Sequence, residues 1–162
     1  MKTIRQARLP EEAALVRALF REYAAEIRID LCFQDFEAEL ADLAGIYGPP
    51  AGRVLLATVG GEVAGCVGVR ALGAGDCEMK RLYVRPVARG RALGRQLAVA
   101  AIEAARDLGY RHMRLDTLDS MAAARALYAS LGFREIPPYY GNPNADVKYM
   151  ELDLAGQRPQ GG

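Results

Sequence analysis

The sequence of 162 residues contains no tryptophan and a single histidine, His112. With one histidine there is no multi-histidine metal site, and a Ser-His-Asp or Cys-His mechanism would depend on that one residue. Cysteine is also scarce, since Cys32, Cys66 and Cys77 lie far apart and form no CxxC pair. This spacing fits neither a disulfide framework nor a zinc site, so we expect reduced thiols in a cytoplasmic protein. No metal is predicted.

Long apolar runs and a net charge are absent as well. No window approaches the roughly 18 uninterrupted apolar residues of a membrane span, and the N-terminus lacks the apolar segment of a signal peptide. The 21 Lys and Arg residues against 20 Asp and Glu residues leave a formal charge of +1. Such a chain has no overall electrostatic footprint for nucleic acid or an acidic membrane. We therefore expect neither as a partner, and any basic site must be local.

The remaining composition is typical of a folded domain. Hydrophobic residues make up 51% of the chain and charged residues 25%. A chain of this length corresponds to one domain with one core. We predict a single domain over residues 1–155 and a polar tail over residues 156–162. The late strands could offer an edge for a homodimer.

Hydrophobic periodicity predicts an α/β (α+β) fold with a central, mostly antiparallel mixed sheet of about seven strands and about four helices. The predicted strands are residues 2–8, 53–59, 62–69, 77–84, 111–117, 133–136 and 147–154, and the predicted helices are residues 10–27, 36–43, 93–108 and 121–131. Gly60-Gly61 predicts a hairpin turn. We expect Pro10 at the first helical position, and Asp119 or Ser120 as the cap of the last helix.

Residues 79–102 are the stretch most informative about chemistry, because they include six Lys and Arg residues and no acidic one. At the centre, Arg89-Gly90-Arg91-Ala92-Leu93-Gly94 follows a predicted strand and begins a predicted helix. Unpaired N–H groups at a helix start, small residues and positive charge together predict an anion site. The plain alternative is a glycine-containing turn with solvated arginines. The glycine spacing does not match a Walker A loop or a dinucleotide fingerprint.

Three segments in order, Leu82-Tyr83-Val84, Arg89 to Gly94 and Ala124 to Phe133, are similar to the GNAT superfamily of acetyl-CoA-dependent N-acetyltransferases. The signature of that superfamily is Arg/Gln-x-x-Gly-x-Gly/Ala at a strand-to-helix junction, and the element order matches over residues 2–154. The resemblance implies transfer of an acetyl group from acetyl-CoA, as co-substrate and without a metal, to a primary amine of a small molecule or peptide.

The resemblance also implies where CoA binds. Backbone N–H groups of the loop from Arg89 to Gly94 would bind the pyrophosphate, with Arg91 or Arg95 near the phosphates. The strand Leu82 to Val84 would pair with the pantetheine arm. The implied cofactor-binding residues are Leu82, Tyr83, Val84, Arg89, Gly90, Arg91, Ala92, Leu93, Gly94 and Arg95. Ala92 replaces the commoner glycine, so we expect a negative φ there, and Met121 stands where the family often has an asparagine that touches the cofactor.

Two residues are the candidates for catalysis. An amine with a pKa near 10 is mostly protonated at pH 7, so a base must take a proton. Glu78 lies where several family members carry a base glutamate; alternatively, it is a solvated carboxylate at a strand edge paired with Lys80 or Arg81. Tyr128 matches the family's tyrosine that protonates the leaving thiolate; alternatively, it packs on the inner face of its helix. The resemblance assigns the oxyanion to the backbone N–H of Leu82.

The acceptor side is less defined. Tyr139, Tyr140 and Asn142 lie in a loop whose family counterpart borders the acceptor site, and they are equally consistent with a loop anchored by packing.

Two other functions remain open. A non-catalytic acyl-CoA-binding or sensing module would bind acetyl-CoA without releasing CoA, and a nucleic-acid-binding domain would show a steep salt dependence, which the neutral net charge disfavours.

Overall fold

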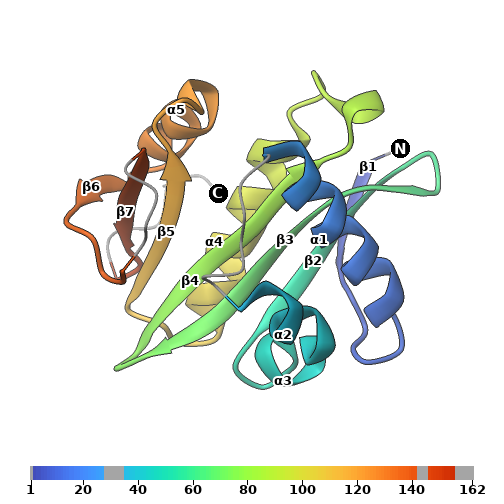
Figure 1. Cartoon of the computed structure of the whole chain (residues 1–162), viewed down its shortest axis with the longest axis horizontal. Helices are drawn as coiled ribbons and strands as arrows, with labels where there is room; N and C mark the ends of the chain where they lie inside the picture. The colour runs from blue at the N-terminus through green and yellow to red at the C-terminus, as the bar shows by residue number, and fades with distance from the viewer. Residues whose placement is uncertain (1, 28–34, 142–145, 156–162) are drawn as a thin grey trace.

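A computed structural model describes residues 2–27, 35–141 and 146–155, so Cys32, Asn142 and the predicted tail lie outside the described residues. A seven-stranded sheet has the strand order β1-β2-β3-β4-β5-β7-β6 (Figure 1). The strands are β1 Lys2–Gln6, β2 Arg53–Val59, β3 Glu62–Gly73, β4 Asp76–Val84, β5 His112–Leu118, β6 Arg134–Ile136 and β7 Val147–Asp153. The α-helices are α1 Ala13–Ile27, α2 Phe36–Ala41, α3 Leu43–Tyr47, α4 Leu93–Asp107 and α5 Ala122–Ser130, with a short 3-10 helix at Pro86–Ala88.

The sheet is mixed but mostly antiparallel, which confirms the predicted fold class. Its one parallel pair is β4 with β5, and every other neighbouring pair is antiparallel. Helices α1, α2 and α3 lie on the front face of the sheet in Figure 1, and α4 lies behind it. Each face therefore has its own core, one formed with α4 and α5 and the other with α1, α2 and α3. Among the described residues, none of the helices is both long and apolar enough to cross a membrane.

The predicted β-hairpin at Gly60-Gly61 is confirmed. Val59 pairs with Glu62, and both glycines have a positive φ, 60° and 86°, which a two-residue turn of this kind requires. The predicted end of α4 is also confirmed, because Gly109 follows the helix with φ 87°. Glycine is needed at these places because a side chain disfavours a positive φ.

Three local predictions are wrong. The single helix expected over 36–43 is instead two helices, α2 and α3, because Asp42 interrupts it and its carboxylate accepts a hydrogen bond from the Gly45 N–H. Helix α1 begins at Ala13, beyond Pro10. Helix α5 has Met121 as its N-cap residue without a side-chain hydrogen bond.

The missed cap of α5 has a physical reason. The backbone N–H of Asp119 donates to the carbonyl of Asp146, and the Asp119 carbonyl accepts from the Arg125 guanidinium. Asp119 is therefore held as a continuation of the β5–β7 pairing and is not positioned to cap the helix that follows. Its carboxylate instead lies 3.8 Å from Arg125.

Candidate functional site

The parallel strands β4 and β5 form a fork. They pair only over Asp76 to Glu78 and His112 to Arg114, so the described remainder of β4 has no pairing with β5. The cause lies at Arg81, which has φ 61° and sits where the β3–β4 register shifts. Such a bulge adds a residue to one strand and bends it away from its neighbour.

The bulge also changes which way the side chains of β4 point. Before it, Met79 belongs to the core formed with α4, and after it Leu82 and Val84 lie against that same core. Lys80 and Arg81 are consecutive, yet both interact on the opposite face, with Asp116 and Glu39 respectively. Regular alternation would have placed Leu82 on the face of Lys80, so the bulge turns apolar side chains into the fork.

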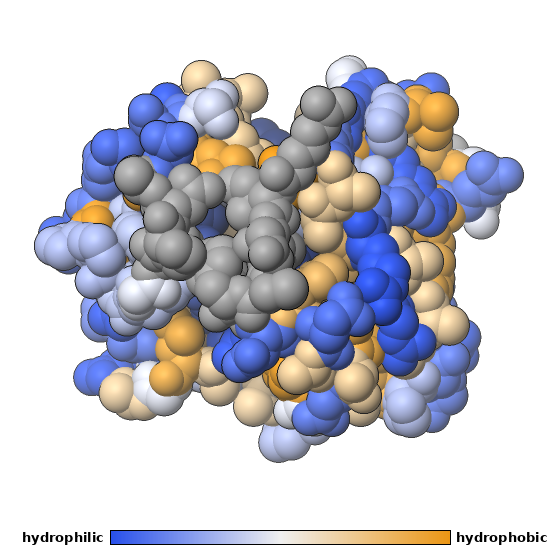
Figure 2. Space-filling model, in the orientation of Figure 1, coloured by the Kyte–Doolittle hydropathy of each residue, from blue (hydrophilic) through white to orange (hydrophobic). Residues whose placement is uncertain are grey.

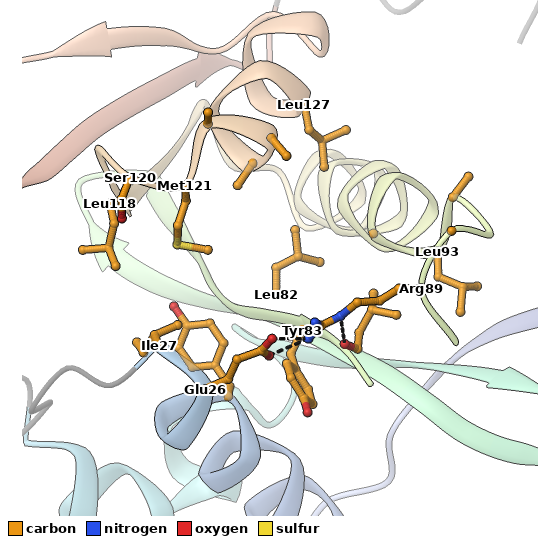
Figure 3. A pocket seen from close by; sticks show the side chains of 18 residues that line it. Glu26, Ile27, Leu82, Tyr83, Arg89, Leu93, Leu118, Ser120, Met121 and Leu127 are labelled. Atoms are coloured by element: carbon orange, nitrogen blue, oxygen red, sulfur yellow. Dashed lines mark hydrogen bonds and ion pairs between the residues drawn. The ribbon is translucent and has the colours of Figure 1, made fainter. Parts of the chain in front are cut away.

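A cavity of about 820 Å³ occupies the fork (Figure 3). Leu82 points into its centre, while Met121 and Leu127 border it from the start and the body of α5. Its lining comes from α1, the end of β4, the loop before α4 and the start of that helix, the end of β5, and α5 with the residues before it: Tyr23, Glu26, Ile27, Leu82, Tyr83, Val84, Arg89, Gly90, Ala92, Leu93, Gly94, Leu118, Ser120, Met121, Ala122, Ala123, Ala124 and Leu127. The cavity is mostly apolar along the strand and opens onto backbone groups at the loop.

The loop before α4 presents a helix start to this cavity. Gly90 has φ 84° and Ala92, the N-cap residue of α4, has φ 59°. The expectation of a negative φ at Ala92 is therefore wrong: the chain enters the left-handed region there even with a methyl group. That conformation costs about 1 to 3 kcal/mol for a residue other than glycine. The first N–H groups of a helix have no partner within the helix, so they are free to bind an anion at this loop.

Acidic residues of α1 neutralise part of the basic stretch. Arg85 forms a two-point ion pair with Glu22, which holds the pKa of that carboxyl below its usual value. Arg89 pairs with Glu26 and donates through Nε to the carbonyl of Val84, so its side chain folds back onto β4 (Figure 3). The basic stretch is therefore largely compensated by tertiary contacts, because of its six members only Arg91 and Arg95 make no ion pair with a described residue.

A buried ion pair supports the bulge. The Arg81 guanidinium donates to both carboxylate oxygens of Glu39 at 3.1 and 2.8 Å, and both side chains are 2% exposed. Tyr47 donates a further hydrogen bond to Glu39 at 2.9 Å, and Arg81 also lies over the Phe36 ring at 5.1 Å. Gly68 makes room for this group, because a Cβ there would come within 2.6 Å of the Tyr47 ring.

Glu78 is buried at the base of the fork. Its Oε2 accepts a hydrogen bond of 2.6 Å from the Tyr139 hydroxyl, and the Lys80 Nζ lies 3.9 Å from its Oε1. Of the alternative, a solvated carboxylate at a strand edge paired with Lys80 or Arg81, the solvation is wrong, because Glu78 is 4% exposed, whereas the proximity to Lys80 is confirmed. Burial raises the pKa of the Tyr139 hydroxyl above its usual value. The negative charges of Glu78 and Asp116 raise it further.

Tyr128 is buried on α5, with its ring edge-on to Phe133 at 5.7 Å. Burial raises its pKa above the usual value, and negative charge at Tyr23 and Asp116 would raise it further. Burial similarly raises the pKa of Tyr23 to about 12. Both phenols therefore hold their protons at neutral pH. Tyr128 makes no side-chain hydrogen bond to another described residue, and its packing also agrees with the core alternative.

The structure gathers the predicted site residues around the fork in two groups. Leu82 to Val84 and the loop from Arg89 to Gly94, except Arg91, line the large cavity, whereas Glu78, Tyr139 and Tyr140 lie together on the side of α2. Arg95 turns away and donates to the Ser130 hydroxyl at 2.9 Å. The sequence reasoning missed Tyr23, Glu39 and Asp116. No local signal marks them, since each approaches the fork through tertiary packing.

Comparison with known proteins agrees with this geometry. The pattern of the Acetyltransferase (GNAT) family matches residues 14–133. An uncharacterized N-acetyltransferase of Schizosaccharomyces pombe is 44% identical over 155 residues, covering 94% of this chain and 95% of the relative. Among solved structures, a GNAT-family acetyltransferase of Staphylococcus aureus Mu50 has a TM-score of 0.77 at 19% identity, covering 95% of this chain and 99% of the other. The structure of yncA from Salmonella typhimurium, solved with its cofactor acetyl-CoA, has a TM-score of 0.67 at 23% identity, with 98% and 97% covered.

The family pattern covers both arms of the fork and the loop before α4, and the yeast relative covers nearly the whole chain. The chain therefore belongs to the GNAT family of acetyltransferases and is an N-acetyltransferase of that type, as the sequence resemblance predicted.

Proposed function

We propose that the protein transfers the acetyl group of acetyl-CoA to a primary amine of a small molecule or peptide, with the thioester in the fork between β4 and β5. The observation that carries this proposal is the cavity that runs along the unpaired part of β4 to the N-terminus of α4. An extended pantetheine arm would add to β4 like a further strand, and the loop N–H groups would bind the pyrophosphate. The acetyl-CoA in the Salmonella neighbour supports the same assignment.

The loop fits a phosphate on steric grounds. A Cβ at Gly94 would have only the Val84 Cγ2 nearby, at 3.9 Å, and a Cβ at Gly90 would meet nothing within 4 Å. The space in front of the backbone is therefore open to a ligand. Arg91 supplies the positive charge at the loop, because Arg95 is turned towards the Ser130 hydroxyl and the other four basic residues are already paired.

The chemistry divides between two groups. Glu78 accepts one proton from the incoming ammonium, directly or through a water. The nitrogen lone pair then attacks the thioester carbon, and the Leu82 N–H stabilises the oxyanion. As the C–S bond breaks with its electron pair on sulfur, Tyr128 donates its proton to the sulfur and recovers one from the nitrogen. The products are the N-acetylated amine, CoA with a free thiol, and one proton.

The first experiment tests the loop. Calorimetry of CoA and of pantetheine, which lacks the phosphates, should show that CoA binds at least about ten-fold more tightly, because charge-assisted hydrogen bonds are lost with pantetheine. Gly94→Glu should abolish CoA binding by placing bulk and negative charge at the pyrophosphate. Gly94→Gln is the matched control, since it adds the same bulk without the charge and should weaken binding less. Equal affinity for CoA and pantetheine would contradict a phosphate-binding loop.

The second experiment tests the base. Glu78→Gln keeps an oxygen that accepts the Tyr139 hydrogen bond but cannot take a proton. We expect kcat/KM to fall by roughly 10²-fold to 10⁴-fold, the usual effect of losing a general base, with the largest loss on amines of high pKa. Glu37→Gln, an exposed residue of α2, is the control and should leave activity unchanged. An unchanged kcat/KM for Glu78→Gln from about pH 6 to 9 would show that the carboxylate is structural. Binding of acetyl-CoA with no release of CoA in the presence of any amine tested would indicate a sensing module instead.

A further inference from the structure

A second cavity, of about 220 Å³, lies on the side of the sheet that carries α1, α2 and α3. Its polar lining comes from α2, β3, β4 and the segment after β6: Glu39, Arg70, Glu78, Lys80, Tyr139 and Tyr140. This side of the sheet faces the reader in Figures 1 and 2. Hydrophilic residues lie over the strands on the left of the view and along α1 on the right. The cavity is small, polar and distinct in lining from the large apolar one.

Both cavities border the fork, and the large one is lined from α1 on one face of the sheet and from α5 on the other. The ion pair between Lys80 and Asp116, 3.7 Å long, joins β4 to β5 where they separate. Two residues farther along the same strands, Leu82 and Leu118 line the large cavity. At about 3.3 Å per residue, this is a distance of about 7 Å along the strands. A small molecule in the second cavity can therefore reach the fork without crossing the core.

Most of the negative charge in the second cavity is already compensated. Both oxygens of Glu39 are taken by Arg81 and Tyr47. The Oε2 of Glu78 is taken by Tyr139. The Oε1 of Glu78 is the exception, because the nearest cations, Arg70 Nε and Lys80 Nζ, are each 3.9 Å away, which is beyond hydrogen-bond distance. One carboxylate oxygen in the cavity is therefore available to a donor.

Arg70 provides the complementary group, a hydrogen-bond donor without an acceptor. Its Nε is buried and has no hydrogen-bond partner among the described residues, and it is the one buried side-chain polar atom of that part of the chain in this state. The Arg70 side chain is 33% exposed, so the rest of the guanidinium reaches the mouth of the cavity. Arg70 pairs directly across the strands with Glu78. Buried donors are nearly always satisfied, and an orphaned one calls for an acceptor such as a ligand oxygen.

We propose that the acceptor is a small amine that carries a carboxylate on or next to the carbon bearing the nitrogen, as an α-amino acid does. Arg70 binds the carboxylate as a specificity-determining residue, and the ammonium lies at the Oε1 of Glu78, facing the fork. The side chains around the cavity carry both signs of charge in balance, so a zwitterion matches them better than an amine with a positive charge alone. This inference rests on the acetyl transfer proposed above and narrows its acceptor.

The test compares amines that differ only in the carboxylate. At saturating acetyl-CoA, kcat/KM is measured for alanine against ethylamine and against alaninamide. We expect alanine to exceed ethylamine by about 10-fold to 150-fold, the range for a hydrogen-bonded pair that includes a charged group. Equal values for alanine and ethylamine would overturn the proposal, as would faster acetylation of a peptide N-terminus than of any free amino acid.

Variants of Arg70 test the assignment to this residue. Arg70→Gln should remove most of the preference for alanine, measured as the ratio of kcat/KM for alanine to kcat/KM for ethylamine in the same variant. Arg70→Lys should retain a part of the preference, since it keeps the charge but loses the planar geometry. Arg21→Gln, an exposed arginine of α1, is the matched control. A preference that survives in a folded Arg70→Gln variant would overturn the assignment.

A failure of the proposed acetyl transfer can be distinguished from a failure of the carboxylate site. If no amine releases CoA from acetyl-CoA, calorimetry of alanine and of ethylamine with the wild-type chain and Arg70→Gln gives an independent result. Alanine binding that depends on Arg70 would support the carboxylate site although acetyl transfer had failed. Absence of alanine binding at millimolar concentration would overturn the site itself.

Discussion

The buried pair of Glu39 and Arg81 allows a quantitative prediction. Glu39→Gln removes the negative charge while leaving the guanidinium buried. Breaking a buried ion pair from one side costs about 3 to 5 kcal/mol, because the remaining charge stays uncompensated. In a domain of this size each kcal/mol shifts Tm by about 2 to 4 °C, so we expect Tm to fall by about 6 to 20 °C. Thermal and urea denaturation, followed by circular dichroism, measure this loss.

Helix α2 provides the matched control. Glu37 pairs with Arg21 through two hydrogen bonds of 3.1 Å, but the two side chains are 70% and 53% exposed. Solvent-exposed pairs contribute about 0 to 1 kcal/mol, so Glu37→Gln should shift Tm by only a few degrees. A loss for Glu39→Gln no larger than that for Glu37→Gln would refute the reasoning about burial.

The same substitution reaches the fork. Arg81 adopts a left-handed backbone conformation, φ 61°, that is unfavourable for a residue with a side chain. Its hydrogen bonds to Glu39 and its contact with Phe36 hold it there. Without Glu39 the bulge loses its support, so we expect acetyl-CoA to bind more weakly to the folded Glu39→Gln protein than to Glu37→Gln. Calorimetry below the lowered Tm separates this effect from unfolding.

Two further predictions concern protonation. Tyr128→Phe should lower kcat by roughly 10²-fold with little change in acetyl-CoA affinity, because it removes a proton donor and keeps the packing ring; a fully active variant would assign Tyr128 to the core alone. At the N-terminus, hydrogen bonds from Arg5 and from the Arg8 backbone lower the pKa of Glu12 from 4.5 to about 2. A carboxyl group whose pKa is lower in the folded than in the unfolded chain stabilises the fold at pH values above its unfolded pKa. This stability is lost as the pH falls from about 4.5 towards 2. Urea denaturation at pH 6 and pH 3 should therefore show a smaller acid-induced loss for Glu12→Gln than for the wild type, and an identical loss would contradict the assignment.

The amino-acid sequence by itself determined the elements and their order. Alternating β-branched residues and glycine turns mark the strands of residues 53–84, and the four-residue spacing of apolar side chains marks α4. These signals are local, because φ and ψ preferences and one-sided burial depend on residues within a few positions of each other. The loop from Arg89 to Gly94 was found in the same way, from small residues at a strand-to-helix junction.

The tertiary structure alone decided the electrostatics and the shape of the site. The basic stretch looks unbalanced along the chain, yet Glu39 and Glu22 reach Arg81 and Arg85 from 42 and 63 residues away. Tyr139 reaches Glu78 from 61 residues away. The bulge at Arg81 carries one of these contacts, the ion pair with Glu39. Charge pairing and desolvation depend on distance in space, so no pattern within a strand or helix reports them.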